Sequence, residues 1–172
     1  MSWPRASTPQ RGCSVPQPVP EPEFDELYRE IILDHYRSPR HTEPLEDPEV
    51  VAEGYNPLCG DEVEVRLRFE NGAVSDLSFG GRGCSISQAS GSMLTDVVIG
   101  KPVDEVRRLI GLFTEMVTDP EVEPAAELGD LEALQGVAKF PVRVKCATLA
   151  WHTLEDGLKQ REAGGHLVQH EE

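Results

Sequence analysis

Basic residues are scarce in this sequence. Its 16 lysines and arginines stand against 31 aspartates and glutamates, which gives a formal net charge of −15. Binding to a phosphate backbone requires clustered lysine and arginine, so the chain is a poor candidate for nucleic-acid binding. Anionic membrane surfaces should repel it for the same reason. A partner protein with a basic face is the more natural companion of such an acidic chain.

Long apolar segments are also missing. No run approaches the roughly 20 apolar residues that a helix needs to cross a bilayer. Arg5 and Arg11 lie near the N-terminus, but no apolar core follows them, so the pattern of a secretory signal is absent. We therefore expect a cytoplasmic protein, in a compartment that keeps thiols reduced.

Cysteine is sparse and irregularly spaced. Cys59 and Cys84 lie 25 positions apart and Cys146 lies 62 further on, so no compact Cys-x-x-Cys pair exists. In a reducing compartment such thiols indicate metal binding or catalysis more than disulfides. The fourth, Cys13, belongs to residues 1–22, which are rich in proline, serine and glutamine. We expect this stretch to be a disordered tail that carries a stray thiol.

The rest of the chain is long enough for one domain with its own core, which we expect over residues 23–160, before a frayed polar tail over 161–172. Alternating residues from 62 to 70, the turn Asn71-Gly72 and a return strand to Phe79 predict a β-hairpin. Helical spacing of apolar residues predicts helices at 24–37, 85–99, 101–117, 131–137 and 144–159. On the first of these, His35 has the pattern of a packed or surface residue more than that of a ligand. Strands come before most helices and do not alternate with them, which favours an α+β domain with a small antiparallel sheet covered by helices on one side.

Three cysteines lie at the boundaries of predicted elements. Cys59 is in the turn before the first strand, Cys84 joins a glycine-rich turn to a helix, and Cys146 is near the start of the last helix. Asp61 follows Cys59 closely enough for one turn to aim both side chains at the same ion. Three thiolates and one carboxylate suit Zn²⁺, with sulfur at ~2.3 Å, and iron in an iron–sulfur cluster also takes thiolates. The spacing alone supports three unrelated thiols about as well as a metal site.

Four sequence blocks around these residues point to one family. In chain order they read Y-R-E-I-I-L-D-H-Y-R-S-P-R, N-P-L-C-G-D, G-G-R-G-C-S-I-S-Q-A-S-G-S-M-L-T and F-P-V-R-V-K-C-A-T-L-A-W. From Leu27 to Leu158 the chain resembles the U-type iron–sulfur cluster assembly proteins, the IscU, NifU N-terminal and SufU group. The resemblance implies a small antiparallel three-stranded sheet covered on one face by helices. It also implies a zinc site whose ligands are Cys59, Asp61, Cys84 and Cys146.

Within this group the chain looks most like SufU. The segment between Cys84 and Cys146 is longer than in IscU and carries an acidic insertion, Thr118 to Gly129. Lys145 stands where IscU has a histidine, so a ligand or shuttle of the IscU-type scaffold is missing. The resemblance therefore implies a zinc-dependent sulfurtransferase, which takes persulfide sulfur from a SufS-type, pyridoxal-phosphate cysteine desulfurase. We expect a monomer or a weak dimer.

The roles of single residues follow as hypotheses. Cys59 is the predicted sulfur acceptor, because it lies on a loop beside Asp61, and Cys146 is the second choice. Arg143 either orients Asp61 or contacts the partner, or it is a plain solvated side chain. Two other functions stay open. The four residues could form a scaffold that assembles and passes on a [2Fe–2S] cluster, or they could form a purely structural zinc site, which usually has four tightly held ligands.

Overall fold

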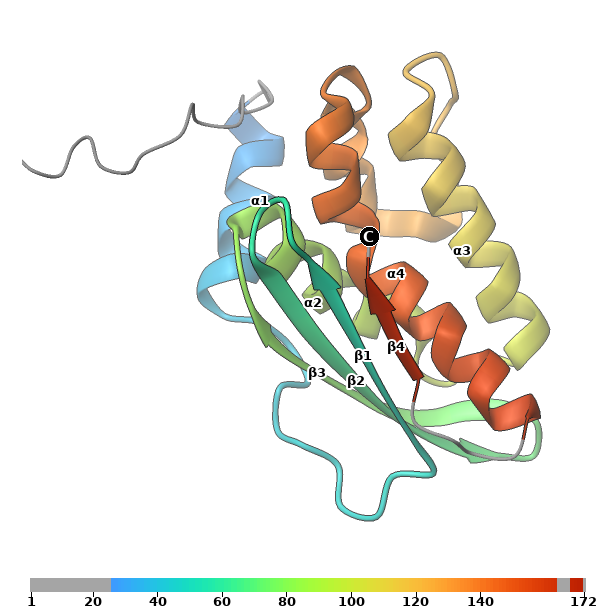
Figure 1. Cartoon of the computed structure of the whole chain (residues 1–172). Coiled ribbons are helices and arrows are strands. Elements are labelled where there is room, and N and C mark those ends of the chain that lie inside the picture. Colours follow the sequence, from blue (N-terminus) through green and yellow to red (C-terminus); the bar gives the residue numbers. More distant parts are fainter. Residues whose placement is uncertain (1–25, 164–167, 172) are drawn as a thin grey trace, which may run out of the picture.

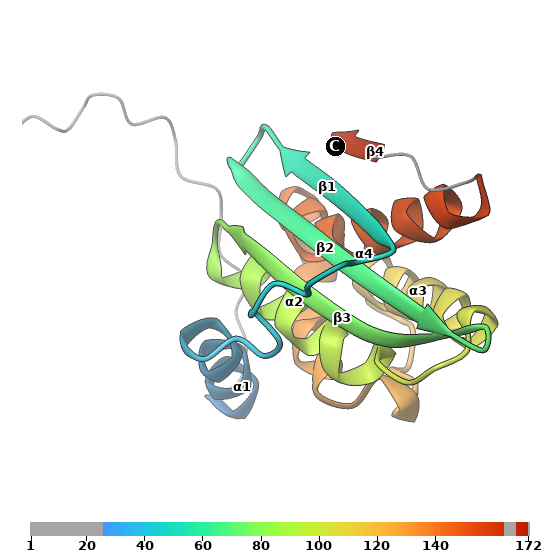
Figure 2. The ribbon, with the colours of Figure 1, turned by 90° about the horizontal axis from the view of Figure 1, so that it is seen from below.

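The computed structural model describes residues 26–163 and 168–171, in which a four-stranded, mostly antiparallel sheet is covered on one face by helices. Figures 1 and 2 show α2, α3 and α4 on the same side of the sheet. The expected α+β class and its three antiparallel strands are confirmed. In chain order the elements are α1 (Glu26–Arg37), β1 (Val50–Asn56), β2 (Asp61–Glu70), β3 (Ala73–Arg82), α2 (Ser85–Val98), α3 (Val103–Thr118), the 3₁₀ segment η2 (Ala126–Lys139), α4 (Pro141–Glu162) and β4 (Val168–Glu171).

The hairpin of β2 and β3 forms where the sequence predicts it. Asn71 and Gly72 have φ angles of 54° and 78°, the left-handed backbone that a tight two-residue turn requires. One detail differs: the register shifts between Arg68 and Phe69, so Phe69 faces Val74. This irregularity buries Val74 and turns Ser75 away from the core, whereas strict alternation predicts the opposite.

Two strands lie outside the predicted hairpin. β1 pairs antiparallel with β2, and the short β4 pairs parallel with β1, so the strand order is β3-β2-β1-β4. Part of the segment expected to fray, residues 161–172, is therefore structured, since α4 also continues to Glu162. The tail predicted for residues 1–22, with Cys13, lies outside the described residues.

The helices begin close to the predicted positions. Asp104 and Glu105 lie in the first turn of α3, where carboxylates favour the positive end of the helix dipole. α4 begins at Pro141, three residues earlier than predicted, which brings Arg143 into its first turn. The acidic stretch before residue 130 is fixed in part by Arg108, which pairs with Glu105 and with Glu127 of η2.

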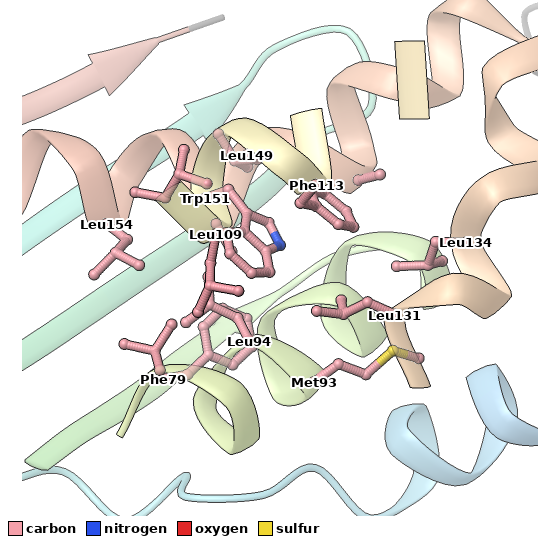
Figure 3. Close-up of a cluster of buried hydrophobic side chains, with 14 of the residues drawn as sticks. Phe79, Met93, Leu94, Leu109, Phe113, Leu131, Leu134, Leu149, Trp151 and Leu154 are labelled. Carbon is pink, nitrogen blue, oxygen red and sulfur yellow. The ribbon is translucent and has the colours of Figure 1, made fainter. Parts of the chain in front are cut away.

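The core between sheet and helices is centred on a stacked aromatic pair. Phe113 and Trp151 have ring centroids 4.6 Å apart and an interplanar angle of 15°, and buried leucines surround them (Figure 3). The indole N–H of Trp151 donates to Ser90 Oγ at 3.1 Å, which links α4 to α2 inside the core. This packing holds α2 and α4 together beneath the sheet; Cys84 directly precedes α2, and Cys146 lies in the second turn of α4. Within residues 26–163 and 168–171, no helix combines the length and the apolarity of a membrane span.

Candidate metal centre

The predicted site residues gather at one end of the sheet. Asn56 pairs with Asp61 across the turn from β1 to β2, and Glu62 pairs with Arg82 at the end of β3. The turn after β1 and the start of α2 therefore lie at the same end of the sheet, as Figure 1 shows. Cys59 is in this turn, and Cys84 directly precedes α2.

Three of the four predicted ligands form a compact group. One atom each from Cys59, Asp61 and Cys146 lie within 4.8 Å of one another. The sulfurs of Cys59 and Cys146 are 3.2 Å apart, and both cysteines are free thiols. Cys84 borders this group: its Sγ lies 3.9 Å from Asp61 Oδ2, and it is hydrogen-bonded to Cys146. The fold thus brings together residues that are up to 87 positions apart in the sequence.

Asp61 is held in place from two sides. It is the first residue of β2 and is fully buried. Its Oδ1 accepts the backbone N–H of Cys84 at 2.9 Å, a bond between a carboxylate and the residue before a helix. Gly83 packs directly against this carboxylate, and a Cβ at this position would overlap it. The φ of Gly83 is +154°, which glycine alone adopts without strain, so the glycine-rich turn has a definite steric purpose.

Cys84 occupies the N-cap position of α2. Its sulfur accepts the backbone N–H of Ser87 at 3.4 Å, in the way that a serine or aspartate side chain caps a helix. The hydrogen bond from Cys146 is the main cause that lowers the pKa of the Cys84 thiol, and the Ser87 N–H adds to it. A lowered pKa near a helix N-terminus is typical of cysteines that act as thiolates.

Cys146 has the opposite environment. It is completely buried in α4, and its pKa is raised because it donates a hydrogen bond to Cys84, because it is desolvated, and because a negative charge on Cys84 opposes its ionisation. Of these two hydrogen-bonded thiols, Cys84 therefore loses its proton more readily, and Cys146 holds its proton more tightly. A metal ion has to displace that proton before it can bind the Cys146 sulfur.

The structure also decides the environment of three other residues. Arg143 is 6% exposed, and its Nη1 lies 3.8 Å from Cys146 Sγ, so the alternative of a plain solvated arginine is wrong. Lys145 is exposed, as a surface or partner-facing residue should be. His35 is a packed residue, with its Nδ1 2.8 Å from Ser92 Oγ, and it does not belong to the group of possible metal ligands.

Asn56 is the site residue that the sequence reading missed. It is fully buried, and its Nδ2 lies 4.0 Å from Cys146 Sγ. An asparagine followed by proline is a recognised turn former, and this signal was available in the N-P-L-C block.

The donor set fits a zinc ion. Two sulfurs and a carboxylate oxygen are already close together, a third sulfur is adjacent, and cysteine and carboxylate are common ligands of four-coordinate Zn²⁺. Four anionic ligands would leave the site with net negative charge, which the guanidinium of Arg143 and the N-terminus of α2 partly balance. Thiolates in such a site stay electron-rich.

Comparison with known proteins gives consistent relatives. The model of the NifU-like N terminal domain matches residues 27–147. The chain is 44% identical to the zinc-dependent sulfurtransferase SufU of Bacillus subtilis over 82% of this chain and 95% of that protein. It is 42% identical to the iron–sulfur cluster assembly scaffold protein IscU of Streptococcus pyogenes, over 85% and 91%. Among solved structures, a putative scaffold protein for the SUF system from Fervidobacterium islandicum has 34% identity and a TM-score of 0.70, covering 75% of this chain and 94% of that one.

Proposed function

The chain belongs to the family of NifU-like N-terminal domains, and from this premise we propose that it serves iron–sulfur cluster assembly as a zinc-dependent sulfur acceptor. The similarity to a zinc-dependent sulfurtransferase over nearly its whole length supports this activity. The donor we propose is a SufS-type cysteine desulfurase, a pyridoxal-phosphate enzyme that carries a persulfide. We expect the reaction in the cytoplasm, where thiols stay reduced.

The proposed zinc ligands are Cys59, Asp61, Cys84 and Cys146. Bound zinc would keep the cysteine sulfurs deprotonated at neutral pH, since a coordinating thiol loses its proton. Contacts within the chain hold three of these ligands in place. The Asp61 carboxylate accepts a hydrogen bond from the backbone N–H of Cys84, and Cys146 is fully buried on α4.

Cys59 is the proposed acceptor, and its position is the observation that carries the proposal. It is half-buried in the turn between β1 and β2, whose other residues, Pro57, Leu58 and Gly60, are exposed. Cys146 is fully buried, and Cys84 is fixed as the cap of a helix. A large partner can therefore reach Cys59 with the least rearrangement. Cys146, whose sulfur is 3.2 Å away, is the second candidate and is close enough to receive sulfur from Cys59.

The proposed step is a thiolate exchange at sulfur. The Cys59 thiolate attacks the outer sulfur of the donor's persulfide, and a new S–S bond forms on Cys59. The S–S bond of the donor breaks, and its cysteine leaves as a thiolate. The persulfide passes from one cysteine to another, so no separate oxidant or reductant is required. Arg143, whose guanidinium reaches the Cys146 sulfur, would hold anionic sulfur in the site.

A scaffold that builds and passes on a [2Fe–2S] cluster is the second candidate. Several relatives carry the name of scaffold proteins, which favours it. Lys145 weighs against it, because an exposed, protonated amine beside Cys146 offers no lone pair to iron. A closed structural zinc site ranks third, since a half-buried cysteine in an exposed turn is not a tightly enclosed ligand.

Two measurements separate these functions. Aerobically purified chain should contain about one zinc per molecule and no visible absorption, because Zn²⁺ is d¹⁰. Added to a cysteine desulfurase with cysteine and a dithiol, it should increase sulfide release. Cys59→Ala should abolish that increase, and Cys13→Ala, which removes a thiol outside the described residues, should leave it unchanged. A red-brown protein with iron and labile sulfide, and no effect on the desulfurase, would instead support the scaffold.

A further inference from the structure

The turn that carries Cys59 is organised by a single buried residue, Asn56. This asparagine ends β1, and its side chain is completely buried. Its Oδ1 accepts the backbone N–H of Leu58 at 3.1 Å, and its backbone carbonyl accepts the N–H of Gly60 at 2.7 Å. The residues on both sides of Cys59 are therefore hydrogen-bonded to the same residue.

The other end of the Asn56 amide faces the second sulfur. Its Nδ2 donates towards Cys146 Sγ at 4.0 Å, and that sulfur lies 3.2 Å from Cys59 Sγ. The contact is long, so its own strength is small. Its importance is geometric, because one planar group touches both the turn that carries Cys59 and the sulfur that α4 brings to it.

We infer that Asn56 is a positioning residue, which holds the turn 57–60 closed on the metal centre and thereby sets how readily Cys59 leaves it. The inference rests on the proposed function only in taking Cys59 as the ligand that moves. Asparagine suits this position because its amide offers an acceptor and a donor on one rigid group. Alanine would remove both contacts. Serine keeps an oxygen that can accept the Leu58 N–H, but it is too short to reach Cys146.

Alkylation of the zinc-loaded protein tests this role without any desulfurase. Each cysteine is followed by peptide mass spectrometry, and the rate at Cys59 is divided by the rate at Cys84 in the same molecules. In Asn56→Ala this ratio should rise about fivefold, the effect of losing one ordinary hydrogen bond from the closed turn. Asn56→Ser should raise the ratio less, because the turn keeps an acceptor.

Asn71→Ala is the matched control. Asn71 lies in the β2–β3 turn with φ 54°, so alanine there strains the backbone and lowers stability without touching the metal centre. Its alkylation ratio should equal that of the unsubstituted chain, although its melting temperature falls. Zinc-loaded Asn56→Ala and Asn56→Ser with unchanged ratios would overturn the inference, whatever their melting temperatures. If the ratios change but no persulfide is ever transferred, the positioning role stands and the proposed function fails.

Discussion

Replacing Gly83 by alanine should damage the metal centre selectively. The new Cβ would overlap the carboxylate of Asp61, and the φ of +154° is unfavourable for any residue except glycine. Backbone strain of ~1–3 kcal/mol, or loss of the charge-assisted bond between Asp61 and the Cys84 N–H, should lower the free energy of unfolding by about 2–4 kcal/mol. For a chain of this size the melting temperature should fall by about 5–15 °C.

Zinc affinity should fall with it, by about 10–100-fold, because the displaced groups orient two proposed ligands. Gly80→Ala is the matched control, since Gly80 lies in the same glycine-rich run and a Cβ there meets no atom within 4 Å. Competition with a chromophoric chelator gives the affinity, and thermal denaturation gives the stability. If both variants bind zinc equally well and melt together, the packing of Gly83 on Asp61 does not position the site.

Three further predictions concern glycines in helices, the pH dependence of stability, and the removal of zinc. Gly91→Ala should destabilise the chain by ~1–3 kcal/mol, because the new Cβ would overlap the Phe79 ring. Gly111 is exposed on its helix and has open space around it, so Gly111→Ala should stabilise the chain by ~0.5–1 kcal/mol. Equal melting temperatures of the two variants would contradict this. Burial lowers the pKa of His35 below its ordinary 6.5, so the unfolded chain binds that proton more tightly. Stability should therefore fall as the pH drops below about 6.5, and His35→Gln should flatten the change in melting temperature between about pH 7.5 and about pH 5.5. Removal of zinc with a chelator should lower the melting temperature and accelerate alkylation of Cys59. If neither the melting temperature nor the alkylation rate changes, zinc is not bound at this centre.

The sequence predicts much of this fold because several elements have strong local signals. Asn71-Gly72 between two strand-like runs is a strong hairpin signal, and both residues have the positive φ angles of such a turn. The segment of small residues after Cys84 forms α2, as predicted. β1 has a weaker signal, because Gly54 interrupts its pattern of strand-forming residues. The structure shows why glycine is needed: Thr153 packs so closely against Gly54 that a side chain would not fit. β4 depends on pairing with β1 more than 100 positions away, which no local pattern encodes.

The residues of the candidate metal centre could be proposed from the sequence, but their geometry could not. The spacing of the three cysteines gave no reason to prefer a site, and the sequence blocks around them supplied that reason. Which side chains would support the site depends on tertiary packing. The sequence is compatible with a solvated Arg143. The structure places this residue in the first turn of α4, where its side chain is buried. The Asn-Pro pair marks Asn56 as a turn residue, but its contact with Cys146 on α4 depends on tertiary packing that no local pattern encodes.

Mapping of the persulfide tests the central proposal most directly. The zinc-loaded chain is mixed with a cysteine desulfurase and cysteine, quenched by alkylation, digested, and analysed by mass spectrometry. Cys59 as sulfur acceptor predicts one additional sulfur atom on the peptide that contains Cys59, and none on that peptide in Cys59→Ser. A persulfide on Cys146 that forms equally well in Cys59→Ser, or no persulfide on any cysteine, would contradict the proposal.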